Sequence, residues 1–403
     1  MLPFSPPHIS QEAIDEVIES LKSGWITTGP KTKKLEVEVS NYVGAKKTLC
    51  LNSATAGLEL ILRWLGVGAG DEVILPAYTY SATANVVMHC GATPILVDID
   101  AVDFNISVNN IRKALTTHTK VIIPVDIAGL PCDYTEIMAL VNELEVKTKF
   151  KPSSLNQQLL GRIFVLADAA HSFGAMYKGH KAALFADASV FSFHAVKNLT
   201  TAEGGAVCLN LPESFDIEEV YKQLNTKALH GQNKDALAKT QKGNWEYDIV
   251  EPGYKWNMPD VLAAIGLASL RNYESEDLVR RKQIVEQYSA GFRDESWAQL
   301  PVFETNSKVS SYHLFMLRIK DASLEQRNAI IQKIFDKDVS VNVHFKPIPL
   351  LSAYSSMFKM SDYPVAYDNY SREISLPVYF SLTDKQVEMV IATVIGSVKA
   401  VMD

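Results

Sequence analysis

Two side chains with complementary chemistry follow neighbouring apolar runs in the sequence. Lys197 lies in the stretch SFHAVKNLTTAEGG, just after the strand-like run 188–191 and just before a Gly pair. Asp168 follows another apolar run, 163–167, about thirty residues upstream. A lysine amine can condense with an aldehyde, and a carboxylate can hold a pyridine nitrogen protonated so that the ring accepts electrons. The pair therefore predicts a site for pyridoxal phosphate (PLP).

The surroundings of both residues favour this interpretation over a surface carboxylate and a solvated lysine. Asp168 is expected at the carboxyl end of a parallel strand, where open α/β sheets bind their ligands. An ion pair with a pyridinium about 4 Å away is worth roughly 4 kcal/mol at an effective dielectric of 20, which would raise the pKa of the ring nitrogen by roughly three units. Lys197 has apolar neighbours, Phe193 and Val196 among them. Burial among such residues favours the neutral amine that an imine requires.

The remaining parts of a cofactor site have candidates with simpler alternatives. The segment 52–57 (NSATAG) follows a predicted strand and opens a helix, so its amides could bind a phosphate, although Ser53 or Thr55 could also be a plain N-cap. Ser192 is a further hydroxyl donor to the same phosphate. Tyr80 could stack on the ring or belong to the core. His171, three residues beyond Asp168, could contact the phenolic oxygen of the cofactor or have a structural role.

The glycine run 66–70 (GVGAG) resembles a nucleotide-binding loop but has the wrong context. A dinucleotide fingerprint follows a strand and opens a helix. Here a predicted helix ends and a predicted strand, 72–75, begins. The run is therefore predicted to be a turn, which disfavours a nicotinamide-dependent oxidoreductase.

Composition excludes several classes of protein. The chain has 403 residues, of which 47% are apolar and 21% charged, with a net charge of -7. That charge argues against nucleic-acid binding, which depends on clustered Lys and Arg. The four cysteines have no metal-ligand spacing, so we expect no metal and a reduced, cytoplasmic setting. No segment approaches 18 apolar residues, and we expect no membrane span.

The order of elements predicts an α/β fold. Apolar runs alternate with helical segments between residues 47 and 210, which predicts a mostly parallel sheet covered by helices. We place a large domain at 1–270, including an N-terminal segment 1–24, and a smaller α+β domain at 271–403. In the first segment, residues 10–22 predict a helix with an apolar stripe. The predicted strands are 48–51, 72–75, 93–97, 120–125, 163–167, 188–193 and 205–209 in the large domain, and 312–319 and 339–343 in the small one. Polar composition predicts a surface insertion at 151–161 and a long mobile loop at 223–253.

Long motifs across nearly the whole chain resemble the DegT/StrS sugar-nucleotide aminotransferases, which are fold type I PLP enzymes. The motifs are SGWITTGPKTKKLE, NSATAGLEL, GDEVILPAYTYSATANVV, GATPILVDID, ADAAHSFGA, FSFHAVKNLTTAEGG, EPGYKWNMPDVLAAIGLASL and VNVHFKPIP. Members that aminate C4 of UDP-linked 4-keto sugars, such as the UDP-4-amino-4-deoxy-L-arabinose aminotransferase, look most similar.

The resemblance implies a role for each matching residue. Lys197 would bind the cofactor covalently and move the proton, and Asp168 would pair with the pyridine nitrogen. The other implied cofactor contacts are Ala54, Thr55, Tyr80, His171, Ser192 and Asn257. The last would reach the neighbouring subunit's phosphate in a homodimer, although Lys255 could be the residue that crosses over. The implied sugar-nucleotide contacts are Thr28, Gly29, Lys255, His344 and the loop 223–253. Asp126 stands where many relatives carry His.

The implied reaction transfers an amino group from L-glutamate, which leaves as 2-oxoglutarate, to a nucleotide-linked keto-deoxy sugar for surface glycan or related amino-sugar biosynthesis. C4 is favoured over C3 as the position aminated. A sugar dehydratase of the same fold is disfavoured because those relatives replace the cofactor lysine with His, whereas this chain keeps Lys197. A regulatory protein that binds PLP without turnover is the remaining alternative.

Overall fold

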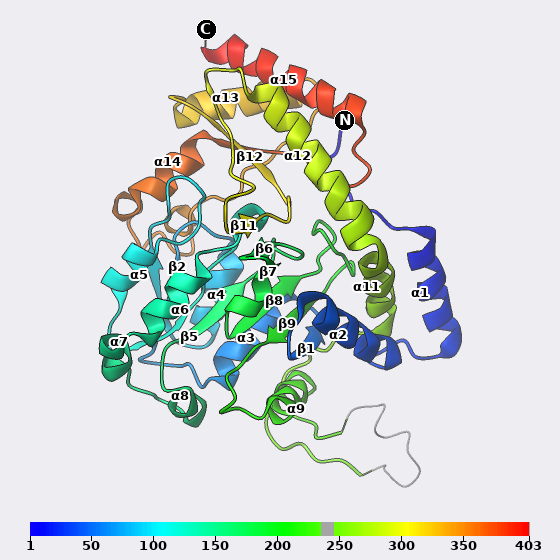
Figure 1. Cartoon of the computed structure of the whole chain (residues 1–403), viewed down its shortest axis with the longest axis vertical. Helices are drawn as coiled ribbons and strands as arrows, with labels where there is room; N and C mark the ends of the chain where they lie inside the picture. Colours follow the sequence, from blue (N-terminus) through cyan, green and yellow to red (C-terminus); the bar gives the residue numbers. More distant parts are fainter. Residues whose placement is uncertain (235–245, 403) are drawn as a thin grey trace.

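The computed structural model describes residues 1–234 and 246–402. Its centre is a seven-stranded sheet in the order β1-β9-β8-β5-β4-β2-β3 (Figure 1). Neighbours from β8 to β3 are parallel, and β9 is antiparallel to both β8 and β1. The strands are β1 (Lys47–Leu51), β2 (Glu72–Pro76), β3 (Thr93–Val97), β4 (Thr119–Ile122), β5 (Phe164–Asp168), β8 (Ala188–Ser192) and β9 (Gly205–Leu209). The mostly parallel sheet predicted from the sequence is confirmed.

Helices cover both faces of this sheet, as the unbroken apolar strands require. In β5, Phe164 and Leu166 pack into one core cluster, whereas Val165 and Ala167 pack into another on the opposite face. The helices are α1 (Gln11–Ser23), α2 (Pro30–Val43), α3 (Ala54–Trp64), α4 (Ser81–His89), α5 (Val108–Ala114), α6 (Tyr134–Asn142), α7 (Leu144–Lys149), α8 (Leu155–Leu160), α9 (Ile217–Ala228) and α11 (Asp260–Asn272). The glycine run 66–70 is the predicted turn between α3 and β2.

A second core lies in the C-terminal part of the chain. Its antiparallel sheet has the order β10-β12-β13, and the helices pack around it (Figure 1). The elements are α12 (Leu278–Phe292), β10 (Ala298–Gln299), β12 (Phe315–Ile319), α13 (Leu324–Phe335), α14 (Pro364–Arg372), β13 (Glu373–Leu376) and α15 (Asp384–Met402). A third small sheet joins β11 (Lys308–Val309) to the hairpin of β6 (Met176–Tyr177) and β7 (His180–Lys181). The predicted boundary between residues 270 and 271 falls inside α11 and stays a prediction.

Two local expectations are wrong, the strand 339–343 and the start of the loop 223–253. Residues 339–343 are not a strand, because this segment makes only isolated bridges, from Val339 to Leu2 and from Asn342 to Ser375. The predicted insertion 151–161 is not contradicted, and it contains the short helix α8, which Ser154 caps by accepting a hydrogen bond from the Gln157 amide. The predicted loop 223–253 begins inside α9, and its residues 235–245 lie outside the described part.

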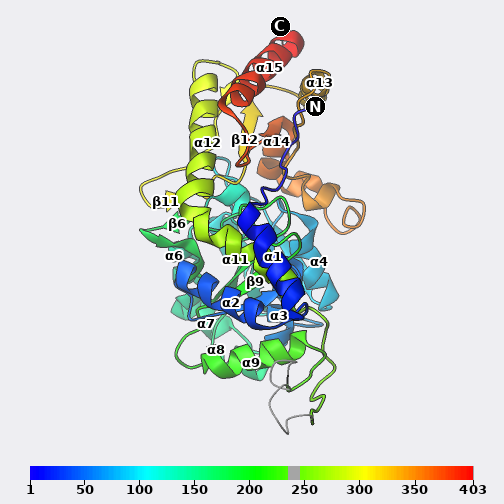
Figure 2. The ribbon, with the colours of Figure 1, turned by 90° about the vertical axis from the view of Figure 1, so that its right-hand side faces the viewer.

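The N-terminal helix α1 forms where the sequence predicts it but buries a different face. Ser10 caps its N-terminus by accepting a hydrogen bond from the Ala13 amide, and Gly24 ends it with a φ of 81°. The helix packs alongside α11 (Figure 2) through a face that buries Ala13 and Ser20. The predicted apolar stripe comprises Ile14, Val17, Ile18 and Leu21. Most of it points away from this contact, since Ile14, Ile18 and Leu21 are 43%, 42% and 57% exposed, whereas Val17 is half-buried.

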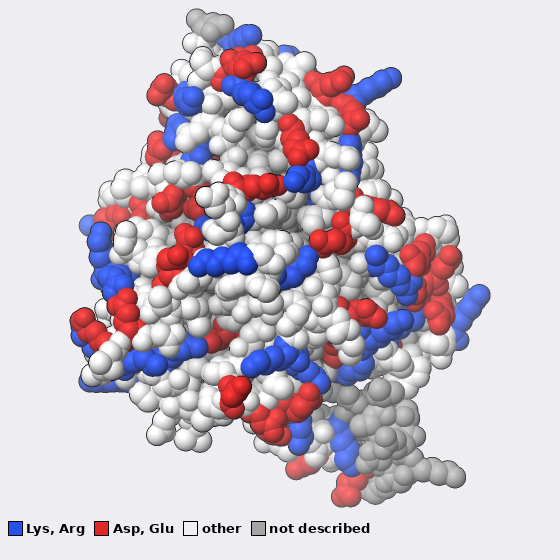
Figure 3. All heavy atoms as spheres, in the orientation of Figure 1, with Lys and Arg blue, Asp and Glu red and all other residues white. Residues whose placement is uncertain are grey.

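The charges are mixed over the face that Figure 3 shows, where acidic and basic side chains alternate without a continuous basic stripe. Within the described residues, no helix is both long and apolar enough to span a membrane.

Candidate active site

A cavity of about 370 Å³ opens where the strands of the large sheet end. Parallel sheets present their carboxyl-terminal ends at one edge, so residues that follow different strands meet there. Eight of the residues predicted for the site line this cavity: Ala54, Thr55, Tyr80, Asp168, His171, Ser192, Lys197 and His344. Residues from the C-terminal part complete the wall, among them His313 and Phe345.

Asp168 is the last residue of β5 and is 6% exposed. Its Oδ2 accepts a hydrogen bond of 2.8 Å from the Thr83 hydroxyl on α4, and its Oδ1 accepts one of 3.3 Å from the Ala170 amide. Burial raises the pKa of this carboxyl, while the Thr83 hydroxyl opposes the rise. Sequence reasoning missed Thr83, although its place in the first turn of a helix after a strand was a usable signal. The carboxylate of Asp168 is thus held in a fixed orientation and can still accept a hydrogen bond from a ligand in the cavity.

Lys197 lies in the turn between β8 and β9. The turn is held by hydrogen bonds from the Lys197 amide to the His194 carbonyl and from the Thr201 amide to the Phe193 carbonyl, both 2.8 Å. Its amine has no hydrogen-bond or ion-pair partner among the described residues. Burial lowers the pKa of Lys197 to about 8, against the opposing effect of the Asp168 charge. With this pKa, a much larger fraction of the amine is neutral near pH 7 than in an ordinary lysine, and that fraction can act as a nucleophile or a base.

The first turn of α3 forms an anion-binding corner of the cavity. Ser53 caps the helix by accepting a hydrogen bond of 3.1 Å from the Ala56 amide. Ser192 pairs with Gly205 across the β8–β9 ladder, beside this turn. A Cβ atom on Gly205 would lie 2.5 Å from the Ala54 nitrogen, so only glycine lets the helix start this close to the strand. The helix N-terminus and the Ser192 hydroxyl suit a phosphate.

Three histidines, His171, His313 and His344, are among the residues that line the same cavity, and burial lowers the pKa of each of them. The pKa values of His171 and His313 lie well below the usual range, and that of His344 falls to about 3, because of burial and the positive charge of Lys197. The rings of His171 and His313 are 4.3 Å apart, and His171 also stacks on Phe345. His171 Nδ1 is buried without a hydrogen-bond partner among the described residues. The sequence analysis did not find His313, which comes from a distant part of the chain.

Four of the predicted site residues do not line this cavity: Thr28, Gly29, Lys255 and Asn257. Asn257 Nδ2 donates to the Thr28 hydroxyl at 2.5 Å, and Lys255 Nζ donates to Asn257 Oδ1. The Gly29 amide donates to the carboxylate of Asp260 at 2.8 Å.

Tyr80 lines the cavity rim with 63% of its surface exposed, and its ring lies 5.9 Å from that of Phe345.

The chain matches the sequence model of the DegT/DnrJ/EryC1/StrS aminotransferase family over residues 7–149 and 159–395. It belongs to that family. The unmatched interval falls in the segment where the sequence predicts an insertion. The chain is accordingly a PLP-dependent aminotransferase of fold type I.

Known proteins resemble this aminotransferase over its whole length. The putative sugar aminotransferase Spr1654 from Streptococcus pneumoniae, in its PMP form, is 48% identical with a TM-score of 0.96, and all of both chains is covered. It has also been solved in a PLP form. The spore coat polysaccharide biosynthesis protein SpsC from Bacillus subtilis is 36% identical over 99% of this chain and 97% of its own. Helicobacter pylori PseC, an aminotransferase involved in the biosynthesis of pseudoaminic acid, is 27% identical with a TM-score of 0.87, covering 99% of each chain.

The residues of this aminotransferase fit its cofactor. Asp168 offers a buried carboxylate for the pyridine nitrogen, the first turn of α3 offers amides for the phosphate, and Lys197 offers an unpaired amine for the aldehyde. The buried, unpartnered Nδ1 of His171 is a polar atom that a ligand oxygen would satisfy.

Proposed function

We propose that this aminotransferase transfers an amino group from L-glutamate to a keto group of a nucleotide-linked keto-deoxy sugar. C4 is the favoured position, because of the motifs shared with enzymes that aminate C4, and C3 is the alternative. The observation that carries the proposal is the unpaired amine of Lys197, with a pKa of about 8, in one cavity with the buried Asp168. The names of SpsC and PseC support a product used in polysaccharide or related amino-sugar biosynthesis.

In this proposal each residue has a defined task. The cofactor, when bound, supplies an aldehyde and a ring that accepts electrons. Asp168 keeps the ring nitrogen protonated, and the helix N-terminus at Ala54 and Thr55 orients the phosphate together with Ser192. Lys197 takes the proton from the donor carbon and returns one to the accepting carbon. His171 would bind the phenolic oxygen of the cofactor, and Tyr80, on the cavity rim, would contact its ring.

We also propose that the active enzyme is a homodimer. Thr28, Lys255 and Asn257 form a polar group outside the cavity of their own chain, which suits residues that serve the partner's site. The exposed apolar stripe of α1 (Ile14, Ile18, Leu21) is the kind of surface that a second copy would cover. The doubly substituted variant Ile14→Asp/Ile18→Asp should shift the protein to a monomer in analytical ultracentrifugation and lose activity. A fully active monomer would contradict the shared site.

The decisive experiment combines trapping with substrate screening. Borohydride reduction of the PLP-loaded enzyme should attach the cofactor to Lys197 and not to Lys120, a buried lysine of the large domain, as peptide mass spectrometry would show. The enzyme converted to its amino form with L-glutamate should then recover the original visible absorbance when a nucleotide-linked 4-keto sugar is added. A 3-keto isomer is the matched comparison. Attachment at another lysine, or recovery with neither sugar class, would refute the proposal.

A further inference from the structure

Asn198, the residue after Lys197, ties the turn that carries the lysine to the C-terminal part of the chain. Its side-chain Nδ2 donates hydrogen bonds to the Ser311 carbonyl at 2.8 Å and to the Tyr273 hydroxyl at 3.2 Å. Tyr273 in turn donates its own hydrogen to the Phe173 carbonyl at 2.6 Å. On the other side, Asn198 Oδ1 lies 2.7 Å from Nδ1 of His313.

This network leaves one tautomer for His313. The Ser311 carbonyl only accepts hydrogen bonds, and the Tyr273 hydroxyl uses its own hydrogen on the Phe173 carbonyl, so both accept from Asn198. This fixes the amide of Asn198 with Nδ2 toward Ser311 and Tyr273 and Oδ1 toward the histidine. Because Oδ1 also only accepts, Nδ1 of His313 must carry the hydrogen. His313 is 5% exposed, and burial and the charge of Lys197 keep its pKa well below the usual range. The ring is therefore neutral, and its other nitrogen, Nε2, has a free lone pair.

His313, whose Nε2 carries this lone pair, lines the same cavity as Lys197. Both residues line that cavity, and Nε2 has no hydrogen-bond partner among the described residues. Burial disfavours a charged imidazole at His313, and the charges of His171 and Lys197 act in the same direction on its pKa. Transamination requires the lysine to be free of the cofactor during turnover, when its amine takes up and gives back a proton. An ammonium in this cavity needs an acceptor.

We propose that His313 is a positioning residue, whose Nε2, oriented by Asn198, accepts a hydrogen bond from the ammonium of Lys197 when the lysine has taken up a proton and turned toward it; in the described structure the two nitrogens are not hydrogen-bonded. The inference rests on the proposed role of Lys197. A neutral acceptor is suited to this task, because a carboxylate in its place would hold the ammonium as a salt bridge and resist its deprotonation. Asn198 thereby couples the lysine to its acceptor through the adjacent peptide bond.

Two substitutions separate this role from a purely structural one. Asn resembles the Nδ1 side of a histidine and Gln the Nε2 side. In His313→Asn the hydrogen bond to Asn198 can persist but the acceptor is lost; in His313→Gln the amide oxygen can replace the acceptor while the hydrogen bond to Asn198 is lost. We expect His313→Asn to lower kcat by about 10- to 100-fold, the effect of one hydrogen bond to a charged group, with KM for glutamate little changed. His313→Gln should retain most of the activity. The reverse order, or two variants equal to the wild type, would overturn the proposal.

A readout apart from turnover completes the test. In cofactor-free protein mixed with PLP, the pH at which covalent attachment reaches half its maximal rate should fall by about one unit in His313→Asn, because the ammonium loses an acceptor, and stay in place in His313→Gln. Nitrogen-15 NMR of labelled histidines should show His313 as the neutral Nδ1–H tautomer. An Nε2–H tautomer would refute the proposal, because Nε2 could then not accept a hydrogen bond from Lys197. Borohydride trapping in each variant distinguishes the two hypotheses. If the cofactor is attached to Lys197 but the variants behave like the wild type, only the role of His313 is wrong. If the cofactor is attached to another residue, the proposed function itself is wrong.

Discussion

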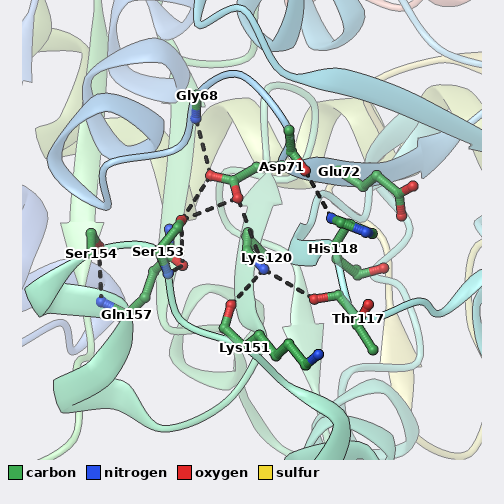
Figure 4. Close-up of polar contacts among 12 residues, drawn as sticks. Gly68, Asp71, Glu72, Thr117, His118, Lys120, Lys151, Ser153, Ser154 and Gln157 are labelled. Carbon is green, nitrogen blue, oxygen red and sulfur yellow. Dashed lines mark hydrogen bonds and ion pairs between the residues drawn. The ribbon is translucent and has the colours of Figure 1, made fainter.

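Lys120 and Lys197, both in the large domain, have amines whose pKa is lowered by desolvation, although Lys120 is buried and Lys197 only half-buried, and the two amines have opposite surroundings. Lys120 on β4 is 4% exposed, and its Nζ donates to the carbonyls of Thr117 at 3.1 Å and Lys151 at 2.6 Å, with Asp71 at 3.9 Å (Figure 4). Lys197 has no such partner among the described residues. Burial lowers the pKa of both amines. Burial therefore does not separate the structural lysine from the reactive one, whereas unused hydrogen-bonding capacity does.

Two buried carboxylates, Asp126 in the segment after β4 and Asp168 at the end of β5, differ in the same way. Asp126 accepts hydrogen bonds from the Ser172 hydroxyl at 2.6 Å, the Tyr134 hydroxyl at 2.8 Å and the Cys132 amide at 2.9 Å. Asp168 has fewer partners and faces the cavity. A fully satisfied buried polar group holds a fold together, and one that keeps spare capacity beside a cavity is available to a ligand.

The largest effect should come from removing the reactive amine. Lys197→Ala should lower transaminase activity by about 10⁴-fold or more, because the covalent link and the proton carrier are both lost. Unfolding by heat should change little, since Lys197 makes no hydrogen bond or ion pair with the described residues. Lys120→Met is the matched control and should keep nearly full activity per folded molecule. Activity of Lys197→Ala within tenfold of the wild type would remove the distinction between the two lysines.

A smaller loss is expected from Asp168→Asn. An amide cannot keep the pyridine nitrogen of the cofactor protonated, so kcat should fall by about 10²- to 10³-fold. The cofactor should still bind, because the first turn of α3 still offers its amides to the phosphate. In Asp126→Asn, activity per folded molecule should stay near that of the wild type and the thermal midpoint should fall, because its three donors lose a charged acceptor. Assays of kcat and thermal unfolding on both variants test the pair. Equal losses of kcat would contradict the assignment.

The pH dependence of Lys197 should differ from that of an ordinary lysine. Its pKa of about 8 lies below the usual 10.5, so the neutral amine is abundant above pH 8 and scarce below it. Covalent attachment of added PLP to the cofactor-free protein should therefore speed up through about pH 8 and then level off. Stopped-flow absorbance between pH 6.5 and 9.5 would measure this. A rate that still rises tenfold per unit at pH 9.5 would indicate an unperturbed lysine.

Sequence reasoning located the parts of the site that follow directly from strand ends. Asp168, Ser192 and Lys197 share a cavity because the strands before them are neighbours in one sheet, and apolar runs predict such strands well. It missed Thr83 despite a usable signal, and it could not find His313 or Asn198 as partners, because their contact depends on tertiary packing between segments far apart in sequence. The exposed stripe of α1 shows the same limit: periodicity predicted the helix but not which face the rest of the chain covers.

The segment around Lys120 offers the smallest and most local test. Ser153, in the interval that the family's sequence model does not match, donates to Asp71 at 3.0 Å, and Asp71 also accepts from the Gly68 amide at 3.1 Å (Figure 4). Ser153→Ala and Lys120→Met should each lower the free energy of unfolding by about 1–3 kcal/mol. The first removes a hydrogen-bond donor to the buried carboxylate of Asp71, and the second removes its ion-pair partner and the donor to the carbonyls of Thr117 and Lys151.

The two changes share Asp71, so their effects should not add. In a double-mutant cycle by chemical denaturation, the combined loss should fall short of the sum by at least about 0.5 kcal/mol. Activity per folded molecule should stay within about twofold of the wild type in all three variants, because neither residue lines the cavity of Lys197. A strictly additive cycle would show that the inserted segment is held independently of Lys120. A large loss of activity in these variants would mean that buried groups whose hydrogen bonds are already made within the protein also contribute to the reaction.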